Sequence, residues 1–403
     1  MIGGNAAAPY YRNRSLWGVS IAASVRSIGY GATWPFLAVY FNTYLHMSLV
    51  FVGLIFTLNS GISIVFSLFA GYMADAFGRK FTLVLGNVAG FILYLLLSIF
   101  SGKSVAIISM LFVLTAFSGS LVFPSANSIV SDITSSTDRE MGYAIYRIMA
   151  NLGWAIGPLI SAIIFSYGFS FIFLFVAIAN AFATIISLIF VKTNAKFRSN
   201  RSGFLVKDYT LFFFSIPVFL LIMVSSQFSV TLPIYIVDDL HIVIRNLAYF
   251  YAVNGIVVVV GQYPISRMMR GHSDLYGLIF GSVFYTIGYL MVSFSHSLFY
   301  LIIDMVIITI GENFTSPNIS TVASKIAPRD KVGRYMGFVG MINQLARTAS
   351  PSVGTFILYS LSSSPILVWP AIDGFGISAI VLFLVFKIVF VDRSRASGRP
   401  VNI

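Results

Sequence analysis

The stretch Gly71-Tyr72-Met73-Ala74-Asp75-Ala76-Phe77-Gly78-Arg79-Lys80 lies between two long apolar runs. It holds one acid, two bases and two glycines within ten residues, and each flanking run is long enough to cross a bilayer. Charged side chains stay hydrated at a membrane face but are costly inside hydrocarbon. We therefore expect residues 71–80 to form a short loop between two membrane helices.

The composition of the whole chain is that of a membrane protein. Apolar residues form 58% of its 403 residues and charged residues 9%, whereas a soluble domain carries about 25% charged residues. This length holds roughly a dozen helices of about 20 apolar residues with short connectors. We predict an all-α membrane protein with 12 transmembrane helices. The expected spans are residues 15–45, 49–72, 80–101, 104–130, 141–166, 169–191, 210–235, 246–267, 274–296, 298–323, 334–360 and 366–391.

The net charge of +12 does not come from one basic patch. With a cytoplasmic N-terminus, the bases fall in the inward segments, among them residues 192–207 and 325–334, and only Lys103 and Arg245 fall in outer loops. This asymmetry follows the positive-inside rule. It predicts a multi-pass protein of the cell membrane with both termini in the cytoplasm, and it explains the basic composition without a nucleic-acid partner.

The longest polar connection divides the chain into two halves. We expect an N-terminal six-helix bundle over residues 1–191, a cytoplasmic linker over 192–209 and a C-terminal six-helix bundle over 210–403. The halves share a weak internal repeat, in which Phe123-Pro124 to Asp132 matches Ser316-Pro317 to Lys325. Repeated halves of this kind are typical of secondary transporters.

The pattern G-x-x-x-D-x-x-G-R-K at residues 71–80 resembles the loop signature of the major facilitator superfamily, where it joins the second and third membrane helices. The segment from Gly153 through Gly157 to Pro158 resembles the G-x-x-x-G-P signature of the drug:proton antiporter-like branch. Ser161 and Ala162 stand where that branch usually has a glycine pair. The resemblance covers essentially the whole chain and implies two six-helix bundles that work by alternating access.

The same resemblance implies a gating role for the loop. Asp75 would stabilise the start of the eleventh helix, and Arg79 would pair with Asp132, so that the two halves are latched on the cytoplasmic side. A simpler alternative is that the loop only fixes the topology through its bases. The expected gating residues are Gly71, Asp75, Gly78, Arg79, Lys80, Asp132 and Arg139.

Ionisable residues inside the apolar spans are the main candidates for function, because each costs a few kcal/mol unless it meets a partner or water. We expect Glu312 to take up and release a coupling proton and the arginines to hold an anionic substrate or that carboxylate. Alternatively, these charges are static ties between helices. Asp373 is expected at the outer membrane interface. The intramembrane set is Arg26, Arg147, Asp304, Glu312 and Arg347.

In a fold of the resembled type, the first, fourth, seventh and tenth helices line a central cavity. The expected lining is aromatic and amide-rich, which suits a lipophilic or amphipathic substrate, whereas the intramembrane arginines favour an organic anion. The candidate lining residues are Tyr30, Trp34, Asn59, Phe123, Asn151, Gln227, Tyr235, Asn254, Asn313 and Asn343.

The sequence shows no pattern of enzyme chemistry. It has no cysteine, no phosphate-binding loop, no cluster with metal-ligand spacing and no nucleophile elbow. We therefore predict a transporter rather than an enzyme, with no cofactor or metal, which works as a monomer in the bilayer. The expected function is proton-coupled export of lipophilic or organic small molecules. The alternatives are uptake or exchange of an organic anion and, outside transport, a membrane receptor or scaffold.

Overall fold

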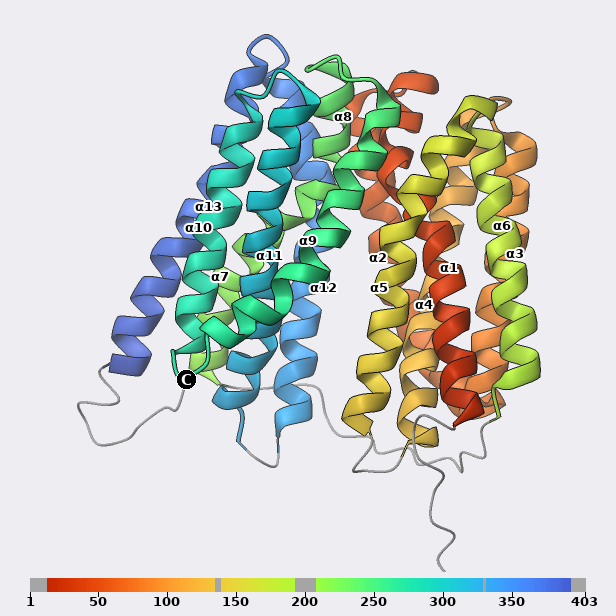
Figure 1. The fold of residues 1–403 in the computed structure, drawn as a ribbon, viewed down its shortest axis with the longest axis horizontal. Coiled ribbons are helices and arrows are strands. Elements are labelled where there is room, and N and C mark those ends of the chain that lie inside the picture. The colour runs from red at the N-terminus through yellow and green to blue at the C-terminus, as the bar shows by residue number, and fades with distance from the viewer. Residues whose placement is uncertain (1–12, 135–138, 193–207, 329–330, 393–403) are drawn as a thin grey trace, which may run out of the picture. The chain divides into compact units, whose positions relative to one another are not determined.

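The computed structural model describes residues 13–134, 139–192, 208–328 and 331–392. Within these ranges all regular structure is helical and no strand occurs (Figure 1). The predicted all-α class is confirmed. The chain divides into two compact units, one of residues 1–36 and 58–200 and the other of residues 37–57 and 201–403.

The first unit is built around α3, which packs against both α4 and α6. A buried cluster that includes Leu16, Leu83 and Ile129 joins α1, α3 and α4 near one end of these helices. The helices with residues in this unit are α1 (Arg14–Val39), α2 (Leu49–Phe77), α3 (Arg79–Phe100), α4 (Val105–Ile133), α5 (Arg139–Ile164) and α6 (Phe169–Phe190).

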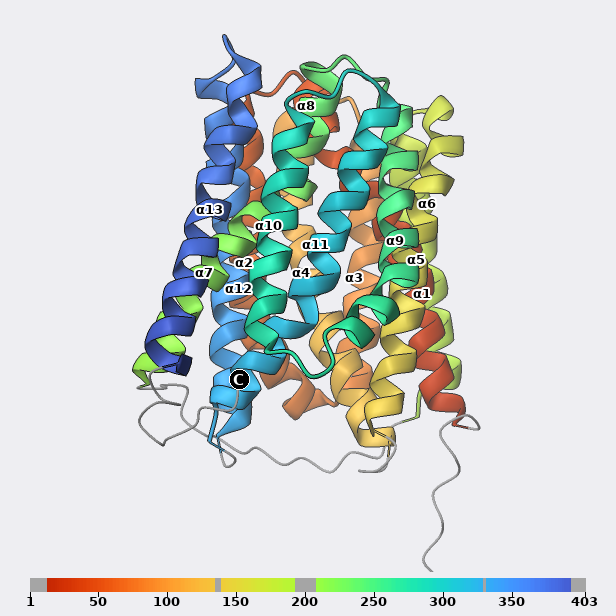
Figure 2. The same ribbon diagram turned by 60° about the vertical axis from the view of Figure 1, so that its left-hand side comes forward.

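The second unit has its largest helix contact between α10 and α11, and Figure 2 shows these helices side by side with α9 next to α11. It also contains the start of α2: Thr57 and Ser352 of α12 are hydrogen-bonded through their hydroxyls at 2.7 Å. The other helices of this unit are η2 (Tyr40–Tyr44), α7 (Tyr209–Ser225), α8 (Thr231–Asp238), α9 (Leu247–Met268), α10 (Asp274–Val292), α11 (Leu298–Ile326), α12 (Val332–Ser360) and α13 (Val368–Phe386).

Ten helical segments of the described residues are long and apolar enough to cross a membrane. Two further helices, α1 with 26 residues and α12 with 29, have the length but are more polar. These are the helices that carry Arg26 and Arg347. With them, the described chain is consistent with the twelve expected membrane helices.

The loop expected at residues 71–80 is mostly helix, which corrects the sequence prediction. Helix α2 continues to Phe77 instead of ending at 72, and α3 begins at Arg79. The turn is therefore Gly78 alone, which has a φ of 96°. Glycine adopts this left-handed region without a steric penalty, and residues 71–77 contain no proline that would break the helix.

The seventh expected helix, residues 210–235, is interrupted. Helix α7 ends at Ser225, a 3-10 turn covers Ser226–Ser229, and Val230 leaves the helical region with φ −130° and ψ −61° before α8 begins. Pro233 contributes to this break, since it has no N–H to donate to Ser229 and its ring crowds that carbonyl in a continuous helix.

Candidate functional site

Glu312 lies on α11 and is partly buried. Its Oε2 accepts a hydrogen bond from Asn254 Nδ2 of α9 at 3.0 Å, and the same amide donates to Thr309 Oγ1 at 3.0 Å. Arg347 of α12 is near enough to act on Glu312 electrostatically, but the described residues form no ion pair between them. The carboxylate of Glu312 is therefore held by a neutral amide. The ion pair with Arg347 that the sequence offered as an alternative is not formed.

Arg26 lies on α1 in the first unit. Its Nη2 donates to Tyr30 Oη at 3.0 Å and to Ser118 Oγ at 3.4 Å, and its guanidinium carbon is 4.3 Å from the centre of the Tyr30 ring. The Tyr30 ring in turn contacts Tyr94 edge-on at 5.5 Å. The buried Nε of Arg26 has no hydrogen-bond partner among the described residues. This cation is held by a ring and hydroxyls and not by an acid.

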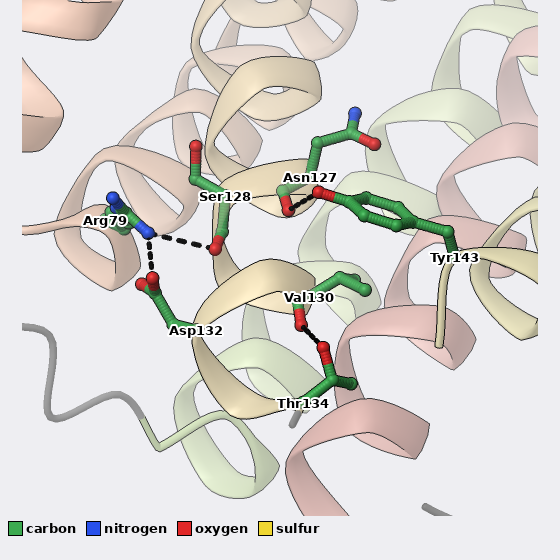
Figure 3. A network of polar contacts seen from close by, with 7 residues as sticks. All are labelled: Arg79, Asn127, Ser128, Val130, Asp132, Thr134 and Tyr143. Carbon is green, nitrogen blue, oxygen red and sulfur yellow. Dashed lines mark hydrogen bonds and ion pairs between the residues drawn. The ribbon is translucent and has the colours of Figure 1, made fainter. Parts of the chain in front are cut away.

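The end of α4 is joined to the start of α3 by an ion pair (Figure 3). Arg79 binds Asp132 and also donates from Nη1 to the Ser128 carbonyl oxygen at 3.0 Å. Close by, Tyr143 Oη of α5 donates to the Asn127 carbonyl at 3.1 Å (Figure 3). The expected Arg79–Asp132 pair is thus present.

An ion pair of reversed polarity occupies the matching place in the second unit. Asp274, the first residue of α10, binds Lys325 near the end of α11. The internal repeat aligns Lys325 with Asp132, so the positive and negative partners have exchanged helices. Sequence inspection missed Asp274, although an acid at the first residue of a helix is a usable signal.

Glycines 153 and 157 allow α5 to touch α1. A Cβ on Gly157 would lie 2.6 Å from the Gly31 carbonyl carbon, and one on Gly153 would lie 2.8 Å from Ser27 Cβ. Ser161 Oγ adds a hydrogen bond to the Ala32 carbonyl of α1. The G-x-x-x-G-P motif therefore serves close helix packing in this chain.

Comparison with known proteins identifies the family. The sequence profile of the Major Facilitator Superfamily matches residues 19–351 and 214–402. The chain belongs to the Major Facilitator Superfamily. It is 26% identical to the uncharacterised MFS-type transporter YdeE of Escherichia coli K12, over 96% of this chain and 98% of that protein.

Two further relatives have names that state a function. The Na(+), Li(+), K(+)/H(+) antiporter of Planococcus maritimus is 22% identical over 92% of each chain. The quinolone resistance protein NorA of Staphylococcus aureus Mu50 is 22% identical over 89% of this chain and 93% of that one. The crystal structure of the nucleoside transporter NupG shares the fold, with a TM-score of 0.77 at 14% identity, over 93% of this chain and 98% of that one.

Within this superfamily fold, three expected lining residues of the second unit are buried in helix packing. Gln227 Nε2 donates to Ser350 Oγ of α12 at 2.9 Å. Tyr235 stands edge-on to Trp369 at 5.5 Å, and Asn313 Nδ2 donates to the Val257 carbonyl at 3.1 Å. In this structure these side chains hold neighbouring helices together. The amide of Asn343, on α12, is partly buried.

The expected lining residues of the first unit differ in exposure. Asn59 is buried and donates to the Phe112 carbonyl at 2.8 Å, and the Trp34 ring lies 6.1 Å from the Phe112 ring. In contrast, Phe123 of α4 and both Arg147 and Asn151 of α5 expose their side chains. Arg147 and Asn151 thus share an accessible stripe of α5, as their spacing of four residues predicts.

The two remaining intramembrane acids are buried. Asp304 is 1% exposed and accepts a 2.5 Å hydrogen bond from Ser295 Oγ, which ties α11 to the connection that precedes it. Asp373, in the first turns of α13, is 2% exposed and is therefore buried in the protein. Its neighbours on α13 are apolar or aromatic, and α13 packs against α7 and α10.

Of the expected gating residues, Gly71, Asp75 and Arg139 lie in helices, but their burial and contacts are outside the described part of the structure. Lys80 is described and donates to the Leu188 carbonyl of α6 at 2.8 Å. At the start of α12, Tyr335 Oη donates to Asp208 Oδ2, and the same carboxylate group caps the N-terminus of α7.

Proposed function

We propose that this Major Facilitator Superfamily transporter exports lipophilic or organic compounds in exchange for protons, with Glu312 as the residue that carries the coupling proton. The observation behind this proposal is the Glu312–Asn254 hydrogen bond. A carboxylate bound to a neutral amide can gain or lose a proton without breaking an ion pair. The names of the cation/proton antiporter and of NorA support ion coupling and export of organic compounds.

The geometry allows both protonation states of Glu312. An ionised carboxylate accepts the N–H of Asn254, as observed, and a protonated one can donate to the amide oxygen after the amide rotates. Asn254 can therefore serve both forms of the side chain. Substrate binding or exposure to the other side of the membrane would release or capture the proton.

Transport would proceed by rocking of two bundles, with boundaries at residues 1–191 and 210–403. The Arg79–Asp132 and Asp274–Lys325 pairs each join two helices of one unit and would keep each bundle rigid during that motion. We place both termini in the cytoplasm, because the bases gather in the inward connections.

A second candidate, transport of an organic anion, rests on Arg26. The four acids of residues 1–200 are Asp75, Asp132, Asp138 and Glu140, all of them in or next to the expected cytoplasmic connections. Arg26 therefore has no acidic counterpart within the apolar spans of its own half. A carboxylate on the substrate would supply one.

The test uses purified protein in proteoliposomes loaded with a pH-sensitive dye and a panel of lipophilic cations, neutral organic compounds and organic carboxylates. We expect substrate-dependent proton flux that is lost in Glu312→Gln and kept in Lys103→Gln, which removes a charge from an exposed connection. Flux of carboxylates that needs Arg26 but no proton would favour the anion transporter. Proton-coupled flux that persists in Glu312→Gln would contradict the role given to Glu312.

A further inference from the structure

Asp373 on α13 is a buried carboxylate that nothing in the described structure satisfies. It is 2% exposed, and neither of its side-chain oxygens has a hydrogen-bond partner among the described residues. An ionised carboxylate without a donor or a cation is strongly disfavoured in such a place, whereas a neutral carboxylic acid is tolerated. This environment therefore favours the protonated, neutral form of the Asp373 carboxyl group.

The neighbours of Asp373 along α13 place it at a junction of three helices. One turn earlier, the Trp369 ring stacks on Tyr289 of α10 at 5.2 Å, and its buried Nε1 also lacks a partner among the described residues. One turn later, a Cβ on Gly376 would lie 3.7 Å from Val224 Cγ2 of α7 and would overlap Thr286 of α10. The face that carries Asp373 is thus packed against α7 and α10.

The same junction contains the interruption between α7 and α8. Tyr289 Oη donates to the carbonyl of Ser225, the last residue of α7, at 3.2 Å. The adjacent Ser226 has a buried Oγ that is unpartnered within the described chain. In secondary transporters, interrupted helices leave backbone and side-chain groups free to hold coupling ions. Unsatisfied polar atoms of three residues, Asp373, Trp369 and Ser226, occur around this one break.

Among the described residues, no base forms an ion pair with Asp373. Helix α7 has no charged residue, and on α10 the sole charged residue is Asp274, which is paired with Lys325 at the start of that helix. Of the titratable groups on α10, Tyr289 interacts electrostatically with Asp373 and also with Glu312. On α12, Arg347 and Tyr359 have exposed side chains.

We propose that Asp373 is a second proton-binding site in addition to Glu312. The protonation state of Asp373 controls how α13 packs against the break between α7 and α8. Binding adds one proton to the carboxylate and breaks no other bond. With Asp373 neutral, the junction packs as observed. With Asp373 ionised, the carboxylate requires water or a donor, so the junction opens near Ser226. This inference needs only the observed fold and does not depend on the exporter proposal.

Infrared spectroscopy of the full-length protein in lipid tests the proton site directly, with the proton itself as the probe. We expect a carboxylic acid C=O band that disappears as the pH is raised from about 5 to about 9. The band should be absent from the near-isosteric Asp373→Asn variant and present in Glu312→Gln. Since no substrate is added, the result stands apart from any failure of the transport assay. A band assigned to Asp373 that persists at every pH, or the lack of any such band, would overturn the proposal.

Thiol labelling tests the coupling to the break, because the chain has no cysteine of its own. The labelling rate of Ser226→Cys is divided by that of Ser363→Cys in an exposed connection, which removes the intrinsic pH dependence of a thiol. We expect this ratio to rise several-fold with pH and to be flat when Asp373→Asn is added. A ratio that is flat in both backgrounds would refute the coupling. If Asp373→Asn does not fold, Asp373→Glu should shift the midpoint of both measurements.

Discussion

At the scale of single residues, the two halves of the chain carry different charges within their apolar spans. Of the intramembrane charges, the first half contributes Arg26 and Arg147, whereas Asp304, Glu312 and Asp373, with one base, Arg347, give the second half an acidic excess. In the structure each of these acids has a different environment: an amide for Glu312, a hydroxyl for Asp304 and no partner for Asp373 among the described residues. We therefore expect the three acids to differ in function.

One carboxyl outside the membrane spans gives a prediction for stability against pH. Asp239 directly follows α8. Burial, and to a smaller extent the neighbouring Asp238 carboxylate, raise the pKa of Asp239 to about 6, although His241 acts in the opposite direction. The folded protein thus binds this proton more tightly than the unfolded chain, whose pKa is near 3.9. Stability should fall as the pH rises from about 4 to about 6, by about 1 kcal/mol once solvent screening is allowed for.

The measurement is thermal unfolding in detergent at several pH values. Asp239→Asn should lose that part of the pH dependence and melt about 1 to 2 °C above the parent protein at neutral pH. Asp239→Glu keeps the charge and serves as the matched control. A pH profile of Asp239→Asn identical to that of the parent would show that this carboxyl does not contribute.

At the scale of helices, glycine and proline decide where elements end and how closely they approach. Gly78 forms the whole turn between α2 and α3, since its φ of 96° is open to glycine at no cost. Pro233 lies just after the break between α7 and α8, whereas Pro124, Pro158 and Pro351 lie inside continuous helices.

Helix contact between α5 and α1 depends on Gly157. In Gly157→Ala, the new methyl would overlap the backbone at Gly31 and Ala32, and backbone atoms cannot rotate away. We expect a loss of about 1 to 3 kcal/mol in the free energy of unfolding, seen as a lower melting temperature in detergent. Gly119→Ala on α4 is the control, because nothing lies within 4 Å of its added methyl. Equal melting temperatures for the two variants would contradict the close contact.

At the scale of the whole molecule, the two compact units are not two continuous halves of the chain, because one segment of the N-terminal half belongs to the second unit. Residues 37–57, which end the first long helix and begin the second, belong to the second unit. Thr43 Oγ1 of η2 donates to Asp238 Oδ1 at 2.9 Å, and Thr57 is bonded to Ser352. The second unit therefore includes residues 37–57, which the boundary predicted at the linker, residues 192–209, assigns to the N-terminal half.

The distribution of bases predicts the orientation of the molecule. With both termini in the cytoplasm, a green fluorescent protein fused after Ile403 should fluoresce, and alkaline phosphatase at the same place should be inactive. Phosphatase inserted after Lys103, in an expected outer loop, should be active. Active phosphatase at the C-terminus would reverse the proposed orientation.

The sequence by itself determined the class of the protein and the places of most membrane helices, which follow from hydropathy, a local property. The Arg79–Asp132 pair was expected because the loop motif resembles that of the major facilitator superfamily, and the structure contains it. Tertiary structure alone decided that Glu312 binds Asn254, that Asp373 is buried, and that Asp274 and Lys325 pair with polarity opposite to their counterparts. Each of these depends on which helix faces meet, and helices that are apolar on nearly every face carry little periodic signal to reveal that. Within the loop quoted at the outset, only Gly78 is a turn, because the preceding seven residues extend α2 to Phe77.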